Sequence, residues 1–199
     1  MFWSSKSTGT LIGVFFIVAT TAAAQGVRPR FGLAAGVTVP TGDYHAGFGT
    51  ALQWVGLLSL RVPGWPVGLR ADATYGGNGA NDQLKSALQT AVGQTVNEKT
   101  RLLGANLDLV LPPSSRSGVK PYLLGGIGGY YTRISVKSGD VTGDNSATTL
   151  AWNVGGGMVW NLRKVSLLLE ARFVDVAPVS GFPRMTFIPI TAGIRFGSR

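Results

Sequence analysis

The chain has 199 residues, of which 18 are basic and 9 acidic, so its formal net charge at pH 7 is +9. It contains no cysteine, which excludes disulfides, thiol catalysis and cysteine-based metal sites. Apolar residues make up 45% of the chain and charged residues only 14%, so we do not expect a disordered protein. The length is compatible with one domain.

The first 24 residues have the pattern of a secretory signal peptide. Lys6 supplies a positive charge, the segment from Leu11 to Ala19 is apolar, and Ala22 and Ala24 place small side chains just before Gln25. The alternative is a membrane-anchoring helix, but the apolar run is shorter than the roughly 20 residues that a spanning helix needs. We therefore expect cleavage after residue 24 and a single domain over residues 25–199.

Eight segments of the remaining chain alternate between apolar and polar or small residues, the period of a β-strand. In chain order they are Phe31–Val39, Thr50–Val62, Val67–Tyr75, Lys99–Leu111, Lys120–Val136, Thr148–Asn161, Val165–Val174 and Met185–Phe196. No segment is long and apolar enough for a membrane-spanning helix.

The connections between these segments alternate in length, which predicts an up-and-down antiparallel meander. Three are tight and contain Pro, Gly or Asn, which suit turns: Pro63–Pro66, Pro112–Gly118 and Asn161–Lys164. Four are longer and polar: Thr41–Phe48, Gly76–Glu98, Ser138–Ala147 and Ala177–Arg184. Within the longest connection, Leu84, Leu88 and Val92 have the spacing of a short amphipathic helix, with a plain loop as the alternative. An even number of strands places both ends of the domain on the side of the short turns.

One face of each strand is apolar and the other is polar or small. The apolar faces include Leu69, Ala71, Ala73, Tyr75, Leu103, Ala105, Leu107, Leu109, Leu150, Trp152, Val154, Met158, Trp160, Leu167, Leu169, Ala171 and Phe173. A soluble lipocalin-like barrel would show the same period. However, the interior of an eight-stranded barrel is only wide enough for side chains to fill, and these large apolar faces would overfill it. We therefore predict an all-β protein, an eight-stranded antiparallel up-and-down transmembrane β-barrel with its apolar faces toward lipid.

The last segment, Met185–Phe196, has to complete the barrel. Its aliphatic face carries Ile190, Ile194 and Phe196. Every backbone polar group in hydrocarbon needs an internal partner, so a sheet there has no free edge. We expect this strand to pair with Phe31–Val39.

The terminal Ile194-Arg195-Phe196, the segment Pro121–Gly128 and the rhythm of strands and loops resemble the small outer-membrane β-barrel family, the OmpA/OmpX-like eight-stranded type. The resemblance implies a protein of the outer membrane of a Gram-negative-type bacterium, in contact with outer-membrane lipids. It also implies that the barrel-assembly machinery reads the last strand, through residues such as Ile190, Ile194 and Phe196. Gly197-Ser198-Arg199 follow Phe196, a departure from a chain that ends on the aromatic residue.

The charged residues fall into distinct groups along this meander. The short-turn end is basic and contains no acid: Arg28, Arg30, Arg116, Lys120, Arg163, Lys164 and Arg199. Attraction to anionic lipid headgroups explains such an end, and no nucleic-acid-binding motif accompanies it, so we do not expect nucleic-acid binding. A second group faces the lumen: Arg61, Arg70, Asp72, Asp108, Glu170, Arg172 and Arg195. We predict that these side chains pair and plug the lumen, with a proton or ion path as the alternative.

Candidate chemistry is sparse. The one histidine, His45, lies near Asp43 in a polar loop without an evident nucleophile, and Asp140 and Asp144 lack the spacing of a calcium loop. We predict no catalytic residues, no metal and no cofactor. The interpretation is a structural or surface-interaction protein with a possible ligand at the long loops. The alternatives are a lipid-modifying enzyme and a narrow small-solute channel.

Overall fold

The computed structural model describes residues 28–42, 45, 49–77, 96–111, 118–138, 141–162, 164–179 and 182–197. The predicted signal peptide and the possible helix around Leu84 to Val92 lie outside these residues. Within the described ranges, no helix is long and apolar enough to cross a membrane.

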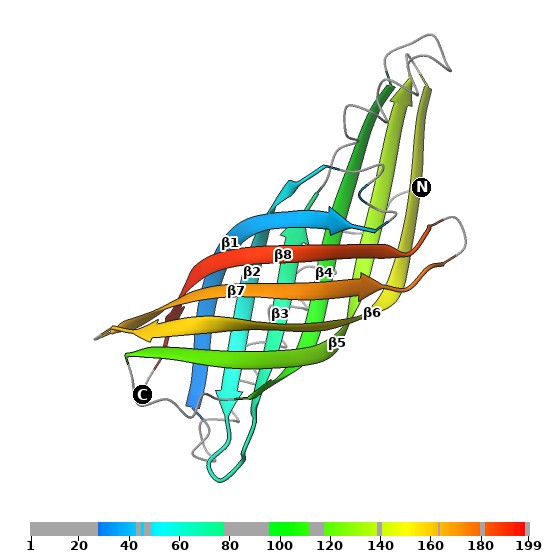
Figure 1. Cartoon of the computed structure of the whole chain (residues 1–199). Coiled ribbons are helices and arrows are strands. Elements are labelled where there is room, and N and C mark those ends of the chain that lie inside the picture. The colour runs from blue at the N-terminus through cyan, green and yellow to red at the C-terminus, as the bar shows by residue number, and fades with distance from the viewer. Residues whose placement is uncertain are drawn as a thin grey trace, which may run out of the picture.

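Eight antiparallel strands close into one barrel, in which each strand pairs with its neighbours in the chain and the first pairs with the last (Figure 1). They are β1 (Arg28–Thr41), β2 (Ala51–Arg61), β3 (Gly68–Gly76), β4 (Val96–Leu111), β5 (Val119–Ser138), β6 (Val141–Asn161), β7 (Val165–Val176) and β8 (Met185–Phe196). The predicted fold class is confirmed, and each strand contains most of one predicted segment.

The seam between β1 and β8 runs over nearly the whole length of the last strand. Phe31 lies opposite Phe196 at one end and Thr41 lies opposite Thr186 at the other. The predicted pairing of the first and last segments is therefore confirmed, and the closed sheet leaves no free edge along this seam.

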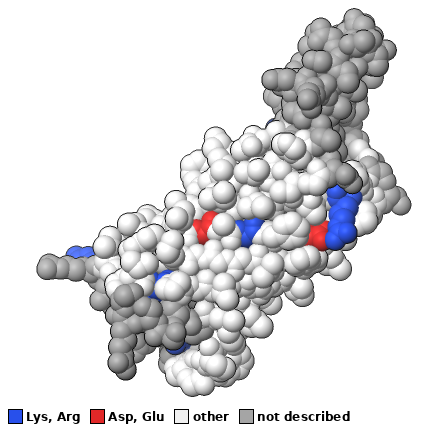
Figure 2. Space-filling view, in the orientation of Figure 1, with Lys and Arg blue, Asp and Glu red and all other residues white. Residues whose placement is uncertain are grey.

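The outer surface is apolar and the lumen holds the polar side chains, as the alternation predicts. On β4, for example, Leu107 is 58% exposed while its neighbour Asp108 is 1% exposed. Figure 2 shows one side of the barrel, on which only a few small groups of charged atoms interrupt an uncharged surface. This surface suits contact with lipid.

Three neighbouring strands are longer than the rest. β4, β5 and β6 contain 16, 20 and 21 residues, whereas each other strand has 14 or fewer. They extend beyond the other strands at one end of the barrel (Figure 1). We call this part the extension; it comprises 96–101 of β4, 130–138 of β5 and 141–149 of β6.

The extension corrects the predicted long loop Ser138–Ala147. β5 and β6 stay paired up to Ser138 opposite Val141, so most of that segment is strand and Asp144 lies on β6. The polarity of Ser138–Ala147 suggested a loop, because strands within a membrane have an apolar face. A strand that continues beyond the membrane needs no such face, and the Thr and Val residues here favour strand.

The lumen is filled in layers. Near the short-turn end lies an apolar cluster of Leu57, Tyr122, Leu124, Val159 and Leu168. Toward the other end lies a second cluster of Tyr130, Ala151, Val174, Val176, Met185 and Phe187. Along β7 the inward side chains run from Leu168 through Glu170 and Arg172 to Val174, so charged residues separate the two clusters.

Candidate functional site

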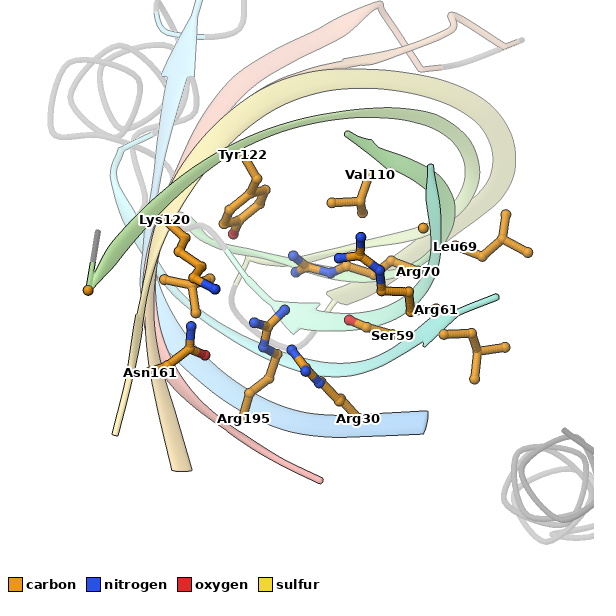
Figure 3. Close-up of a pocket in the computed structure, with 14 residues that line it drawn as sticks. Arg30, Ser59, Arg61, Leu69, Arg70, Val110, Lys120, Tyr122, Asn161 and Arg195 are labelled. Carbon is orange, nitrogen blue, oxygen red and sulfur yellow. The ribbon is translucent and has the colours of Figure 1, made fainter. Parts of the chain in front are cut away.

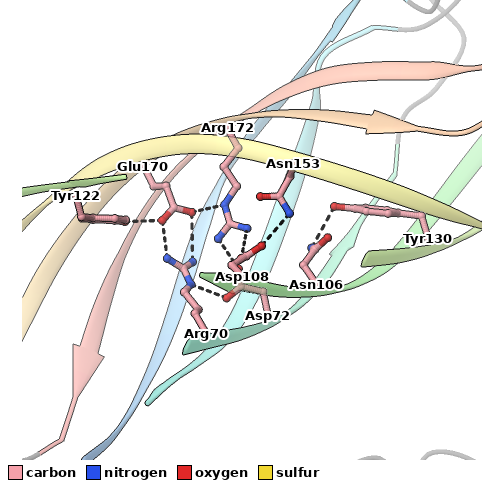
Figure 4. Close-up of polar contacts among 9 residues, drawn as sticks. All are labelled: Arg70, Asp72, Asn106, Asp108, Tyr122, Tyr130, Asn153, Glu170 and Arg172. Carbon is pink, nitrogen blue, oxygen red and sulfur yellow. Dashed lines mark hydrogen bonds and ion pairs between the residues drawn. The ribbon is translucent and has the colours of Figure 1, made fainter. Parts of the chain in front are cut away.

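Five buried charged side chains meet in the middle of the lumen (Figure 4). β3 contributes Arg70 and Asp72, β4 contributes Asp108, and β7 contributes Glu170 and Arg172. Residues two apart on a strand point to the same face, so the alternation of each strand directs these side chains inward. We call this group the central network.

Arg70 joins β3 to β7. Its Nε lies 2.7 Å from Asp72 Oδ1, and its Nη1 and Nη2 lie 2.5 Å and 3.2 Å from the two carboxylate oxygens of Glu170. The contact with Glu170 is bidentate, the geometry in which a guanidinium binds a carboxylate most strongly.

Arg172 contacts all three carboxylates. Its Nε lies 2.6 Å from Glu170 Oε1 and its Nη1 lies 2.8 Å from Asp108 Oδ2, while Nη2 pairs with Asp72. Two guanidinium groups thus hold three carboxylates, which leaves one formal negative charge within the network.

Neutral side chains donate further hydrogen bonds to two of the three carboxylates. Tyr122 donates its hydroxyl hydrogen to Glu170, and Asn153 Nδ2 donates to Asp108 Oδ1 over 2.9 Å. Asn106 Nδ2 in turn donates to Tyr130 Oη over 3.2 Å. Neither Tyr122 nor Tyr130 was among the lumen residues predicted from the sequence. The signal available was their position on the inward face of β5, where a buried hydroxyl needs a partner.

Glycines on β5 and β6 provide the space for these side chains. A Cβ atom at Gly126 would overlap Asp108, both at its carboxylate and at its Cα 2.7 Å away. A Cβ atom at Gly155 would lie 2.7 Å from Arg172 Cα and 2.9 Å from its Cγ. Both glycines are therefore required by close approach to the central network, in agreement with the close packing expected of strand glycines.

Two of the seven predicted lumen residues are not among the five side chains of the central network. Arg61 and Arg195 line a cavity of about 420 Å³ at the short-turn end (Figure 3). The ion pairs described for the barrel include neither of them. Both lie close to strand ends, Arg61 as the last residue of β2 and Arg195 as the last but one of β8.

The residues of the last strand that were predicted to take part in barrel assembly face outward. Ile190, Ile194 and Phe196 lie on the outer face of β8 and are exposed. Their recognition by the barrel-assembly machinery stays a prediction.

His45 is exposed, and its backbone N–H donates to Gly42 O over 3.1 Å. Asp43 and Asp140 lie outside the described residues. In the part of the chain that the structure describes, no group of three His, Asp or Glu side chains could hold a metal ion.

Comparison with known proteins identifies the family. Residues 10–196 match the model of the outer membrane protein beta-barrel domain. The chain belongs to this family. It is an integral β-barrel protein of the Gram-negative outer membrane.

Solved structures of other outer-membrane barrels share the fold. A major outer membrane protein from Thermus thermophilus is 12% identical, with a TM-score of 0.63 over 85% of this chain and 99% of that one. Neisserial surface protein A is 20% identical, with a TM-score of 0.53 over 86% of this chain and 97% of that one. At such identities the likeness concerns the fold alone. None of the curated proteins compared with the chain matches it.

Proposed function

We propose that this protein is a non-catalytic outer-membrane barrel that presents its extension at the cell surface for interaction with other molecules. The observation that carries the proposal is the pair of strand edges on the extension that no described strand covers. An unpaired strand edge offers a row of backbone donors and acceptors to an extended peptide, a common mode of protein recognition.

The register defines both edges. β3 reaches β4 only as far as Gly76 opposite Leu102, so 96–101 of β4 have no partner among the described strands on that side. β7 reaches β6 only as far as Val176 opposite Ala151, so 141–149 of β6 are likewise unpaired by any described strand. Between them, β5 pairs with both β4 and β6 over the full height of the extension.

The central network supports a structural role for the barrel below the extension. Paired charges across β3, β4 and β7 fix the distance between opposite walls, and apolar clusters fill the lumen on both sides of them. A rigid barrel of this kind holds the extension in a defined position.

The role of the extension can be tested by shortening it. Deleting residues 135–144 and joining Ile134 to Asn145, which lie opposite each other, through an Asn-Gly turn removes the top of the extension. We expect the shortened barrel to fold, as judged by its altered gel migration without heating, while cells that express it lose adhesion to immobilised protein surfaces. Adhesion equal to that of the full-length protein would contradict the proposal.

The orientation can be tested separately with inserted tags. The proposal requires that the long connections face the cell exterior, so a tag at Gly79, between β3 and β4, should be accessible on intact cells. A tag at Ser114, between β4 and β5, should become accessible only after the outer membrane is permeabilised. The reverse pattern would place the extension in the periplasm and refute the surface role.

The plugged lumen can be tested by conductance. With the central network and two apolar clusters in the lumen, we expect the purified barrel in a planar bilayer to show no sustained current. Steady ohmic conductance from the unmodified protein would favour a channel instead.

A further inference from the structure

The cavity at the short-turn end adjoins the central network and lies at the opposite end of the barrel from the extension. It has a volume of about 420 Å³ and is lined by residues from the ends of seven strands (Figure 3). Its inner end reaches Arg70 and Tyr122, which also belong to the hydrogen bonds of the central network. Its volume lies in the range of roughly 300–1,000 Å³ typical of small-molecule sites.

Cations dominate the lining of this cavity. Besides Arg70, the lining contains Arg30, Arg61, Lys120 and Arg195, and it contains no Asp or Glu. In Figure 3 the charged ends of these side chains converge on the same space. The single negative charge left over in the central network is too small to balance four cations, so the short-turn half of the lumen carries a net positive charge.

Two buried donors of the lining have no hydrogen-bond partner in the described structure. They are the hydroxyl of Ser59 and the Nε–H of Arg195. A buried donor without a partner costs roughly 1–3 kcal/mol, so natural proteins rarely keep one without a use for it. Both donors belong to the cavity where the cations converge.

We propose that this cavity is a binding site for a phosphoryl group. Three guanidinium groups and one ammonium group around one space match the several oxygens and the charge of a phosphate, and the planar fork of arginine binds phosphate oxygens in pairs. Ser59 Oγ adds a neutral donor, and the Nε–H of Arg195 is the donor without a described partner in one of these guanidinium groups. The site is independent of the proposed surface function, because it lies at the opposite end of the barrel.

Two sources could supply the phosphoryl group. One is the headgroup of an anionic phospholipid from the adjacent leaflet, and the other is a soluble phosphorylated compound. Both would use the same donors, and separate measurements distinguish them.

The first measurement is a calorimetric titration of inorganic pyrophosphate into the full-length barrel in a non-ionic detergent. The variants Arg61→Gln and Arg195→Gln each remove one cation from the lining. Lys164→Gln is the matched control, because Lys164 is exposed at the same end but is absent from the lining of this cavity. Gel migration without heating checks the fold of each variant.

We expect saturable binding, a loss of affinity of about tenfold or more in Arg61→Gln and Arg195→Gln, and a change of less than about twofold in Lys164→Gln. Arg61 is exposed and has no described ion pair, so its variant tests the site even if Arg195→Gln fails to fold.

The second measurement is native mass spectrometry of the barrel from nanodiscs containing equal amounts of phosphatidylglycerol and phosphatidylcholine. Preferential retention of phosphatidylglycerol that is lost in Arg61→Gln identifies a lipid, and pyrophosphate binding without such retention identifies a soluble compound. Absence of both kinds of binding would overturn the proposal. An equal loss in Lys164→Gln would also overturn it, since diffuse attraction to the basic end would then explain the data.

Discussion

Arginine side chains occupy two regions of the lumen, and the regions differ in the groups that surround each arginine. In the central network, Arg70 and Arg172 meet three carboxylates and every contact is within hydrogen-bond distance. In the cavity at the short-turn end, Arg61 and Arg195 lie near other cations, and the lining contains no acidic residue. The same side chain is a structural element in one region and a proposed ligand-binding group in the other.

This difference indicates that the role of a charged lumen residue depends on the groups that its side chain contacts, and not on its charge alone. A buried cation that donates hydrogen bonds to carboxylates stabilises the barrel only together with those carboxylates. Removal of either partner would leave a buried charge uncompensated, which costs free energy of folding. A cation without a carboxylate keeps its donors available. The following variants compare the two regions and extend the comparison to the lipid-facing surface.

The largest effect is expected when Arg172 is removed. Arg172→Ala leaves Asp72, Asp108 and Glu170 with Arg70 as the remaining guanidinium, and breaking such buried pairs costs on the order of 3–5 kcal/mol. Arg61→Ala, the control in the cavity, should change stability by no more than about 0.5 kcal/mol. Urea unfolding in detergent, followed by tryptophan fluorescence, measures both. Equal losses of unfolding free energy in the two variants would contradict the difference between the central network and the cavity.

A new arginine on the outer surface gives a third environment for the same side chain. Ile190→Arg on β8 places a charge against lipid with neither carboxylates nor a polar cavity, at a cost of about 2–4 kcal/mol near the membrane midplane. Thr191→Ser, on the lumen face of the same strand, removes one buried methyl group and should cost less than about 1 kcal/mol. The same unfolding measurement in lipid bilayers compares them. If the two variants lost the same stability, the assignment of inner and outer faces would be wrong.

A smaller effect is expected from crowding the central network without removing a charge. Gly126→Ala introduces a methyl group that overlaps Asp108, and overpacking of this kind costs about 1–3 kcal/mol. Gly129→Ala on the same strand is the control, because the nearest atom to its Cβ is Thr149 O at 3.9 Å. A thermal melt by circular dichroism should separate the two variants. A Gly126→Ala barrel as stable as the control would show that the network can shift to accommodate the methyl group.

The sequence predicted the barrel well and the lumen only in part. Alternation distinguishes the two faces of each strand, and Arg70, Asp72, Asp108, Glu170 and Arg172 are buried on the face that it indicates for the lumen. It does not give the height of a residue within the barrel, because height depends on the shear between strands. For this reason Arg61 and Arg195 were grouped with carboxylates that lie elsewhere along the axis.

Apolar residues inside the lumen were missed for a related reason. Large apolar side chains were predicted mainly on the outside, yet Leu57 and Val174 point inward and are buried. A Cβ atom at Gly32 would lie 2.8 Å from Leu57 Cδ1, so this glycine provides space for one of these side chains. The balance between large and small residues on facing strands becomes visible only when the register is known.

The seam between β1 and β8 has a consequence for how the barrel forms. Seven of the eight pairings join strands that follow each other in the chain, and each can form as a local hairpin. The eighth joins Phe31 to Phe196 across nearly the whole domain, and contacts between residues so distant in sequence form slowly. Until β8 arrives, the growing sheet exposes the edge of β1 to any other strand nearby. Closure is therefore a single late event, and a factor that shields β1 during this interval would shorten the stage at which two chains can become entangled.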